Sequence, residues 1–487
     1  MADETKSYDP PIEEIRIAVM GNVDAGKSSL LGVLKSGTLD NGRGSARQHI
    51  FKHPHEAETG RTSSVSHHYL KTDGWRPKDL ETNESNKILT FVDLAGHEKY
   101  LKTTLYGVNG SSVSYIMLMI SAVDGVIGTT KEHLEIALAL RIPLFIVITK
   151  MDQAADKKDV LEDNLTYLEE FIVRKKKRRL YPIKNLDQVK KMPAAILSEK
   201  SKVIPLFKIS NTTGDGVDLI RGFLSTLPEI IDWRPVRNPD ENKTLMNIQD
   251  SYNVPGIGLV VYGVVKRGSV SISAGPKDTI LLGPFNGVFK PVLVRSIHDN
   301  YKNNIDFLPA GCSGCLAIKS TGKDVIRRNQ IKKGMVITAE AAQIQFFKAL
   351  VQIIHHPTSI KKGYEPTVHC GTIFQTAQIT NITKLNKHTR EPLKESDVST
   401  PDDLTYLRAG DLAEVTFKFL HHLEFIENGS TIFFREGETK GLGKITELLP
   451  EEREPFTNKP SRRQRQGRRR QRKKRQRGTR TEESTTN

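Results

Sequence analysis

The sequence predicts an α/β unit with a doubly wound, mostly parallel sheet, followed by two antiparallel β-barrels. Three observations support this prediction. The 487 residues are enough for about three domains with substantial cores. Strand-like apolar runs alternate with helical patterns up to residue 232, and polar motifs follow the strands at their carboxyl ends. From residue 243 onward, short strands are broken by Gly, Pro and Asn, which is typical of a small barrel or sandwich.

These patterns divide the chain into three folded units, one linker and two tails. The linker contains two prolines and several charged residues, and neither tail has the apolar runs that a core needs. The predicted boundaries are a disordered N-terminal tail at 1–13, the α/β unit at 14–232, the linker at 233–242, the first barrel at 243–340, the second barrel at 341–450 and a disordered basic tail at 451–487.

Composition limits the compartment in which the protein works. Three cysteines in a chain of this length argue against a disulfide framework and favour a reducing compartment. The first residues contain no apolar run typical of a signal peptide, and no window approaches the ~18 apolar residues of a membrane span. We expect a monomeric, cytoplasmic protein without a membrane span.

A phosphate-binding loop follows the first predicted strand, the apolar run from Ile15 to Met20. It has the pattern G-x-x-x-x-G-K-S, and a helical run begins at Lys27. The glycines permit a turn that aims several backbone N–H groups at one phosphate, and the helix N-terminus adds partial positive charge. We expect Lys27 to contact the β- and γ-phosphates and Ser28 to bind Mg²⁺. The predicted nucleotide-binding residues here are Gly21, Asn22, Val23, Asp24, Ala25, Gly26, Lys27, Ser28 and Ser29.

A second motif for the phosphates follows the apolar run from Ile88 to Val92. Asp93, at the end of this predicted strand, has the position of a Walker B aspartate, which holds Mg²⁺ through a water molecule. Gly96 lets the backbone approach the γ-phosphate. The stretch from Ser36 to Val65, between the two motifs, is too long for an ordinary connection and is typical of functional loops.

The other elements of the α/β unit continue the alternation. A capping box, Thr129-x-x-Glu132, opens one helix. Apolar residues at i, i+4, i+7 and i+11, counted from Leu161, indicate another helix. Apolar runs predict three further strands at 115–120, 144–148 and 203–209.

The segment Thr149-Lys150-Met151-Asp152 lies at a strand end and selects the base. A carboxylate buried at Asp152 can accept hydrogen bonds from N1–H and the 2-amino group of guanine, and adenine has neither donor. Such a site discriminates against an analogue that lacks these donors by a factor of about 10⁴ or more in binding. We expect Lys150 to lie along the base, and Ser210 with its neighbouring backbone, at Asn211, to close over the guanine oxygen. In this order at successive strand ends, the motifs predict a GTPase domain that binds GTP and GDP.

The motifs resemble those of the translational GTPases related to elongation factor Tu and eukaryotic elongation factor 1 alpha. The residues that carry the resemblance are Gly21–Ser28, Asp93–His97 and Gly60-Arg61-Thr62, and the likeness extends over about residues 14–450. The run from Ser45 to Val65, and Thr149 in place of the usual Asn, are similar to one branch, the GTP-binding protein 1/2 family.

The resemblance implies roles for several of these residues. His97 would position the attacking water once a ribosome orders it, Thr62 would close on Mg²⁺ and the γ-phosphate, and Asp24 would help to hold a monovalent cation. The implied catalytic residues are therefore His97, Lys27 and Thr62, and the implied Mg²⁺ ligands are Ser28, Thr62 and Asp93.

Two positions depart from the family pattern. Thr149 replaces an Asn that normally bonds the base and braces the P-loop, so we expect weaker guanine binding. Arg61 stands where elongation factors usually carry an apolar residue that, with Val23, screens the catalytic histidine from the water. This chain therefore differs from elongation factors in the residues that separate the catalytic histidine from the attacking water.

Both predicted barrels fall within the resemblance. In elongation factors the first barrel receives the aminoacylated end of tRNA and the second grips its T-stem, which makes Glu436 and Gly437 candidates for tRNA contact; the alternative is a plain turn. Cys312-x-x-Cys315 has no second pair to complete a zinc site, and we interpret it, like Cys370, as strand residues of the core. The predicted strands are 259–265, 279–282, 289–297 and 315–319, then 349–354, 367–373, 412–420 and 431–434.

Positive charge is concentrated in the C-terminal tail. Residues 461–487 contain twelve Lys or Arg and two Glu, a net +10 out of +16 for the chain. Such a segment binds RNA phosphates by counterion release, without sequence readout. The alternatives are a nuclear or nucleolar targeting signal and a solvated tail. The basic run from Arg174 to Arg179, at the mouth of an expected insertion reaching about Lys202, is likewise either an RNA-facing surface or a solvated helix end.

The resemblance implies a translational GTPase that hydrolyses GTP on the ribosome. Its role would be the delivery of aminoacyl-tRNA, in elongation or in stalled-ribosome surveillance. The alternative is a GTP-gated RNA-binding adaptor that recruits mRNA-decay or release partners, in which hydrolysis only resets the switch. Arg61 and the polycationic tail support this alternative.

Overall fold

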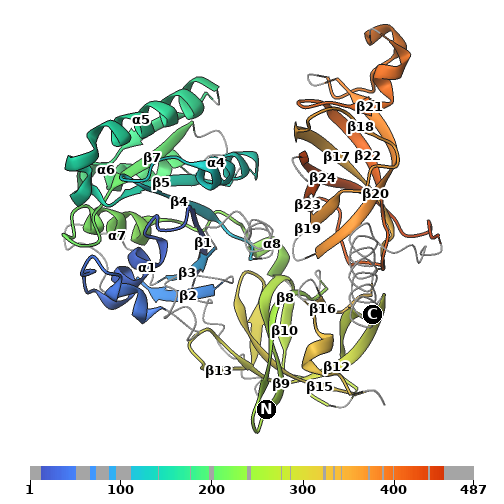
Figure 1. Ribbon diagram of the computed structural model, residues 1–487. Helices are drawn as coiled ribbons and strands as arrows, with labels where there is room; N and C mark the ends of the chain where they lie inside the picture. The colour runs from blue at the N-terminus through green and yellow to red at the C-terminus, as the bar shows by residue number, and fades with distance from the viewer. Residues whose placement is uncertain are drawn as a thin grey trace, which may run out of the picture.

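The computed structural model gives helices, strands and turns for most of the chain (Figure 1). The described residues are 13–50, 66–72, 87–94, 111–140, 142–175, 177–196, 202–237, 243–275, 277–285, 287–321, 325–332, 335–341, 343–370, 373–386, 389–398, 400–436 and 439–454. Among them, no helix is both long enough and apolar enough to span a bilayer.

A mixed seven-stranded sheet forms the N-terminal unit. Its strands are β1 (Glu14–Gly21), β2 (Ser66–Lys71), β3 (Ile88–Asp93), β4 (Tyr115–Ser121), β5 (Leu144–Thr149), β6 (Arg179–Pro182) and β7 (Val203–Lys208). They lie in the order β2-β3-β1-β4-β5-β7-β6, with β2 antiparallel to β3 and the other described pairs parallel. β1, β3, β4 and β5 are buried over their whole length, as strands covered on both faces must be.

Helices cover both faces of this sheet (Figure 1). On one face, Ile15, Ile17 and Val19 of β1 share an apolar cluster with helices α1 (Lys27–Ser36), α6 (Leu186–Ile196) and α7 (Val217–Thr226). On the other face, Ala18 and Met20 share a cluster with α4 (Gly128–Leu140) and α5 (Lys158–Leu168), which continues as a π-helix over Glu169–Lys175. The alternation of a strand thus sends successive side chains into two separate cores.

One segment differs from the sequence-based expectation. The residues after Arg179 are not an insertion outside the fold, because β6 pairs in parallel with β7 and extends the sheet. Helix α6 then covers this edge, with Val189 and Met192 buried in the same core as α1. Leu186, Val189 and Met192 of α6 do have helical spacing, but a Pro inside the segment disfavours a helix prediction there.

The second unit is a closed barrel of six antiparallel strands. The strands are β8 (Leu245–Val254), β9 (Gly258–Arg267), β11 (Ile280–Phe285), β12 (Val288–His298), β15 (Ser313–Ser320) and β16 (Val336–Thr338). They follow the order β11-β16-β8-β9-β15-β12, and pairing of β11 with β12 closes the ring. β13 (Asn304–Ile305) extends β12, and β10 (Ser269–Ser271) pairs separately with β14 (Phe307–Pro309).

Trp233, at the start of the predicted linker, is part of this second unit. It is buried and belongs to the core of the barrel, and the short helix α8 (Arg234–Arg237) follows it. Arg237 Nε donates to the carbonyl of Ala310 at 2.9 Å. The first residues after the α/β unit are therefore fixed to the barrel.

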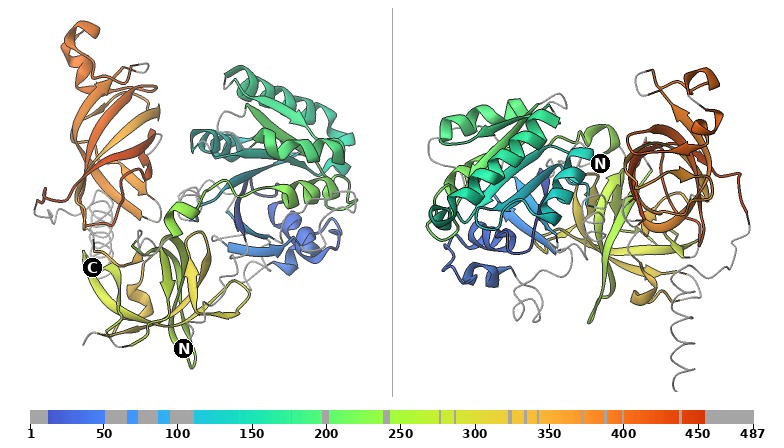
Figure 2. Two further views of the ribbon diagram at one scale, coloured as in Figure 1. Left: turned by 180° about the vertical axis from the view of Figure 1, so that it is seen from behind. Right: turned by 45° about the horizontal axis from the view of Figure 1, so that its top comes forward.

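The third unit is a second closed antiparallel barrel, seen nearly end-on in the right-hand view of Figure 2. Its strands are β17 (Phe346–His355), β19 (Thr367–Cys370), β20 (Ile373–Leu385), β22 (Leu412–Phe419), β23 (Thr431–Glu436) and β24 (Thr439–Leu449), in the order β17-β22-β20-β19-β23-β24. A small pair, β18 (Ile360–Lys361) and β21 (Tyr406–Leu407), lies beside it. The two barrels confirm the predicted fold class.

The strand predicted at 367–373 is wrong in one respect. Cys370 pairs with Ile373, so the chain reverses between these two residues and the run belongs to two strands, β19 and β20. Gly371 and Thr372 interrupt the apolar run in the sequence, and this Gly is a hairpin signal that the prediction of one strand overlooked. Cys370 is buried in the barrel core as expected, whereas Cys312 and Cys315 are only half-buried.

Buried polar contacts join the α/β unit to the second unit. Glu14 and Arg16, on β1, form an ion pair at 3.2 Å with side chains only 4% and 2% exposed. Glu14 accepts hydrogen bonds from the hydroxyl and backbone N–H of Ser313, at 2.7 and 3.0 Å, and Arg16 donates to the Gly311 carbonyl at 2.5 Å. These bonds attach the barrel to the strand that leads into the P-loop.

A second joint lies on β2, and a third involves the last barrel. The Tyr69 hydroxyl donates to the Tyr262 hydroxyl at 2.6 Å, connecting β2 with β9. Phe433 of β23 is 1% exposed and belongs to the same apolar cluster as Leu134 of α4. The α/β unit therefore contacts both barrels.

Candidate functional site

The P-loop has the backbone geometry that its glycines predict. Gly21 ends β1 with a φ of 144°, and a Cβ at this position would lie 2.4 Å from the carbonyl oxygen of Met119. Gly26 precedes α1 with a φ of 79°. A side chain at Gly21 would collide with the neighbouring strand, and both conformations disfavour residues with a Cβ. The loop can therefore turn sharply from β1 into α1.

Lys27, in the first turn of α1, is held across the loop. Its Nζ donates to the carbonyls of Gly21 and Asn22, at 3.1 and 2.7 Å. Burial lowers the pKa of Lys27, and the charges of Asp93 and Asp24 offset part of this effect. A buried ammonium group beside an anion-binding loop is well placed to meet a phosphate.

Ser28 and Asp93 come together from different elements, as the sequence predicts. The hydroxyl of Ser28, in α1, donates to Asp93 Oδ2 at the end of β3, at 3.0 Å. A hydroxyl and a carboxylate are the oxygen ligands that Mg²⁺ prefers, and the adjacent loop would supply nucleotide phosphates. The donor set therefore fits Mg²⁺.

Asp152 and Ser210 form the base side of the site. Ser210 Oγ donates a hydrogen bond to Asp152 Oδ1 at 2.7 Å. It also accepts hydrogen bonds from the backbone N–H groups of Thr212 and Thr213. The expectation of a buried Asp152 is wrong: this side chain is exposed at the sheet edge. Its carboxylate oxygens are therefore open to a ligand, and Ser210 fixes their direction.

Lys150 is held by Asp124, an acid outside the predicted motifs. Its Nζ forms an ion pair with Asp124 Oδ2 at 3.1 Å, and its backbone is left-handed with a φ of 59°. Burial acts to raise the pKa of Asp124, but hydrogen bonds from Ser121 and Lys150 outweigh it and lower that pKa. Asp124 thus fixes the side chain expected to lie along the base.

Thr149 retains the connection to the P-loop. Its hydroxyl is fully buried and contacts the carbonyls of Ala25, at 3.0 Å, and Ile120, at 3.3 Å. Ala25 lies within the loop, so the end of β5 is joined to it. The replacement of Asn by Thr at this position preserves the brace.

His133 of α4 is a supporting residue that sequence analysis missed. Its Nδ1 accepts the backbone N–H of Gly21 at 3.1 Å, so this ring carries no proton on Nδ1. The residue is 1% exposed, and burial, with the nearby charge of Lys27, lowers its pKa to about 3. A single histidine on an amphipathic helix gives no distinctive sequence signal, because most such residues are structural.

This lowered pKa predicts a pH dependence of stability. Below its ordinary pKa of 6.5 the unfolded state protonates His133, whereas the folded state keeps it neutral down to about pH 3. The folded state therefore loses stability as pH falls through this window, by about 1.4 kcal/mol at about pH 5.5. Urea unfolding at about pH 7.5 and 5.5 should show this loss in the wild type but not in His133→Asn. The exposed control His49→Asn should keep the wild-type dependence, and an equal pH response in both variants would contradict the assignment.

The remaining phosphate-side predictions lie outside the described residues. They are Thr62, Gly96 and His97, together with Arg61, which stands where elongation factors usually carry an apolar residue. Asp24 is exposed at the loop, in a left-handed conformation with a φ of 60°. The structure thus brings together the P-loop, Asp93 and the base-side residues, at the carboxyl ends of β1, β3, β5 and β7.

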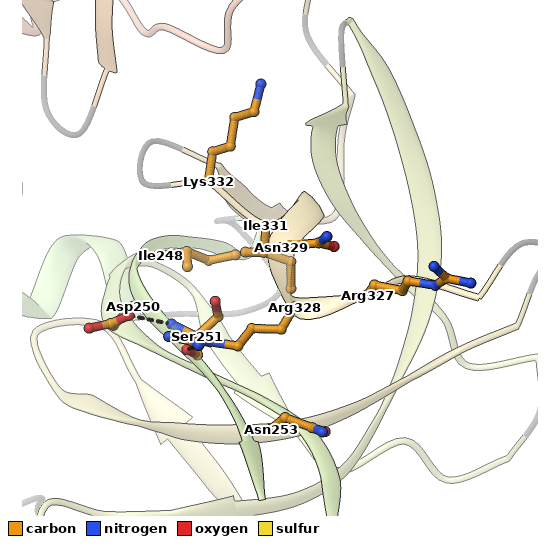
Figure 3. Close-up of a pocket in the computed structure, with 9 residues that line it drawn as sticks. All are labelled: Ile248, Asp250, Ser251, Asn253, Arg327, Arg328, Asn329, Ile331 and Lys332. Carbon is orange, nitrogen blue, oxygen red and sulfur yellow. Dashed lines mark hydrogen bonds between the residues drawn. The ribbon is translucent and has the colours of Figure 1, made fainter.

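The second unit has a surface cavity of about 540 Å³ that sequence analysis did not predict (Figure 3). It lies between β8 and the short 3₁₀ turn at Arg328–Gln330. Arg328 Nε donates to the Ser251 carbonyl at 2.8 Å, whereas the side chains of Arg327 and Lys332 point away from Ser251. Three cations and one acid, Asp250, are among the lining residues, so the surroundings of the cavity carry a net positive charge.

The candidate tRNA contact lies at one end of the third unit. Glu436 is exposed at the end of β23 and pairs with Thr439, and Gly437 is outside the described residues. The Thr439 hydroxyl contacts His356 Nδ1 at 2.5 Å and Tyr364 Oη at 3.0 Å. Glu436 thus stands beside a fixed cluster of polar aromatic side chains.

Comparisons with known proteins agree with this fold. Residues 13–253 match the family described as the elongation factor Tu GTP binding domain. GTP-binding protein 1 of Xenopus laevis is 38% identical over 466 residues, and GTP-binding protein 2 of Mus musculus is 34% identical over 448 residues. The alignments cover 92% and 89% of this chain, and 65% and 69% of the two relatives. The chain thus spans about two thirds of the length of these relatives.

The fold also matches that of solved structures. The S. cerevisiae Ski7 GTPase-like domain bound to GTP superposes with a TM-score of 0.64 at 15% identity, over 89% of this chain and 97% of that one. The α/β unit, its nucleotide motifs and the two barrels define the class of translational GTPases. Within that class, the chain belongs to the GTP-binding protein 1/2 family.

Proposed function

We propose that this protein hydrolyses GTP to GDP and phosphate on the ribosome. The observation that carries the proposal is the Asp152–Ser210 pair next to the P-loop. Ser210 uses one lone pair of the carboxylate, and the remaining ones can accept N1–H and the 2-amino group of guanine. The proposed nucleotide-binding residues are the loop from Gly21 to Ser29, with Asp93, Gly96, Thr149, Lys150, Asp152, Ser210 and Asn211.

Hydrolysis needs an in-line water and positive charge against the transferring phosphoryl group. Lys27 would supply one charge by moving from the loop carbonyls to the β- and γ-phosphates. Mg²⁺, when bound, would neutralise further charge, with Ser28, Thr62 and, through water, Asp93 as the residues that hold it. A monovalent cation near Asp24 is the remaining cofactor that the family resemblance suggests.

His97 would orient the attacking water when the ribosome orders it. We expect His97→Ala to lower ribosome-stimulated GTP hydrolysis by about 10²-fold, the lower end of the range for a residue that orients or activates a reactant. Turnover should be measured with and without ribosomes, and GDP affinity should stay within about threefold of wild type. The control His49→Asn replaces an exposed histidine between the motifs and should retain stimulation.

The outcome separates the two candidate functions. Strong ribosome stimulation that depends on His97 supports the translational enzyme, and also means that Arg61 does not prevent its activation. Slow turnover, independent of both ribosomes and His97, would instead favour the GTP-gated adaptor that recruits mRNA-decay or release partners.

We further propose that the protein brings aminoacylated tRNA to the ribosome. Glu436 and Gly437 are the candidate contacts, and the cationic cavity of the second unit would suit an RNA phosphate. The GTP-bound protein should then slow the spontaneous deacylation of aminoacyl-tRNA. Unchanged deacylation would remove the delivery role and leave the ribosome-dependent GTPase intact.

The C-terminal tail is the second proposed contact with RNA. Its net charge of +10 would bind phosphates without sequence preference, and it could also direct a nuclear or nucleolar visit of a mainly cytoplasmic monomer. Deleting residues 461–487 should weaken RNA binding while leaving intrinsic GTP turnover unchanged. An equal fall in turnover would mean that the tail is not a separate RNA contact.

A further inference from the structure

Two side chains from neighbouring strand ends meet above the P-loop. Thr149 ends β5, and Asn211 follows β7, which pairs with β5 in parallel. A Cβ placed on Gly26 would lie 3.5 Å from both Thr149 Oγ1 and Asn211 Nδ2. The two side chains therefore flank the same glycine of the loop, on the side where Asp152 and Ser210 lie.

Thr149 cannot contact the base from this position. Its one hydroxyl proton is directed at the carbonyls of Ala25 and Ile120, and its side chain is fully buried. Turning the hydroxyl toward a ligand would abandon both carbonyls. Thr149 therefore serves the loop and leaves the base to another residue.

Asn211 has the opposite character. It is 9% exposed, and its Oδ1 is buried without a hydrogen-bond partner among the described residues. Its backbone is fixed, because the Asn211 carbonyl accepts the N–H of Asp40 at 2.9 Å. A buried amide atom without a partner costs about 1–3 kcal/mol, a cost that a ligand supplying the missing bond would remove.

The position of the amide indicates which part of the ligand it meets. With the Watson–Crick edge of guanine on Asp152, the acceptors O6 and N7 lie on the adjoining edge of the ring. The backbone next to Ser210 is suited to O6, which leaves N7 for a side chain near Gly26. A half-turn of the amide exchanges its oxygen and its NH₂ group, so this position can donate to an acceptor.

We propose that the Asn211 side chain donates a hydrogen bond to N7 of guanine, while Thr149 braces the P-loop. Two tasks that one Asn performs in the related elongation factors are then divided between the ends of β5 and β7. This inference rests on the proposed binding of guanine nucleotides at this site. It removes the expectation that Thr149 weakens guanine binding, because the amide is supplied from the next strand.

The test compares GDP with 7-deaza-GDP, which has a carbon in place of N7. The wild-type protein should bind GDP about tenfold more tightly than 7-deaza-GDP, the ratio for one lost hydrogen bond of about 1.4 kcal/mol. Asn211→Ala should lose about tenfold in GDP affinity and bind the two ligands equally. The control Asn185→Ala removes an exposed amide just before α6, far from the base-side residues, and should retain the tenfold preference.

Each failure has its own meaning. If the wild-type protein binds GDP and 7-deaza-GDP equally, Asn211 has no role at N7, while guanine recognition by Asp152 stays in place. This measurement needs no variant. A preference that persists in Asn211→Ala would lead to the same conclusion, with circular dichroism confirming that the variant is folded. If the protein binds ADP tightly, or binds neither GDP nor 7-deaza-GDP, the proposed function itself would be overturned.

Discussion

Replacing Asp152 by Asn should exchange the base that the site accepts. In Asp152→Asn, the amide NH₂ would face the 2-amino group of guanine, so affinity for GDP should fall by about 10⁴-fold. Xanthine has an oxygen at position 2, which accepts from this NH₂, and its N1–H still donates to the amide oxygen. Xanthosine diphosphate should therefore bind to the variant and not to the wild type, which fluorescence titration with both nucleotides would measure.

Asp215→Asn is the matched control for this exchange. Asp215 is an exposed acid five residues after Ser210, and its carboxylate accepts the hydroxyl of Thr213 at 2.7 Å. It should retain wild-type GDP affinity and gain no binding of the xanthine nucleotide. If Asp152→Asn also keeps its preference for GDP, Asp152 does not contact the base.

The second large effect concerns the joint between the α/β unit and the first barrel. Glu14→Gln should destabilise the protein by about 3–5 kcal/mol, because Arg16 would remain buried and charged without its carboxylate. Arginine cannot escape this cost by losing its proton. Urea unfolding followed by fluorescence should show the loss, together with earlier separation of the barrel that contains Ser313.

An exposed pair provides the comparison. Lys243 and Glu340 form an ion pair whose side chains are 62% and 54% exposed. Glu340→Gln should therefore change the free energy of unfolding by less than about 1 kcal/mol. Similar losses in both variants would mean that Glu14 contributes only as an ordinary surface charge.

The sequence predicted those parts of the site that depend on local spacing. Gly21, Gly26 and Lys27 follow from the backbone turn and its helix, and Asp93 follows from the end of a buried strand. In a parallel sheet the strand ends share one edge, so Asp152 and Ser210 could be expected together without knowledge of the coordinates. Their 2.7 Å hydrogen bond confirms that proximity.

Other residues of the site depend on contacts between distant segments. His133 reaches Gly21 across 112 residues, and the bond of Thr149 to Ala25 spans 124. Thr149 could have been a base contact or a brace, and only the direction of its hydroxyl decides between them. The ion pair of Glu14 and Arg16 was hidden for a related reason: alternating charges on a strand usually indicate an exposed face, but here a second unit covers them.

Strand β1 carries the barrel joint near one end and the phosphate loop at the other. The attachment of the barrel and the retention of nucleotide are thus two equilibria that share a single buried element. Any coupling between such equilibria is reciprocal. If a partner that pulls the barrel away from Glu14 weakens nucleotide binding by some factor, bound nucleotide weakens the binding of that partner by the same factor. If the two equilibria are coupled, a change at this ion pair would alter nucleotide retention without any contact to the base or the phosphates.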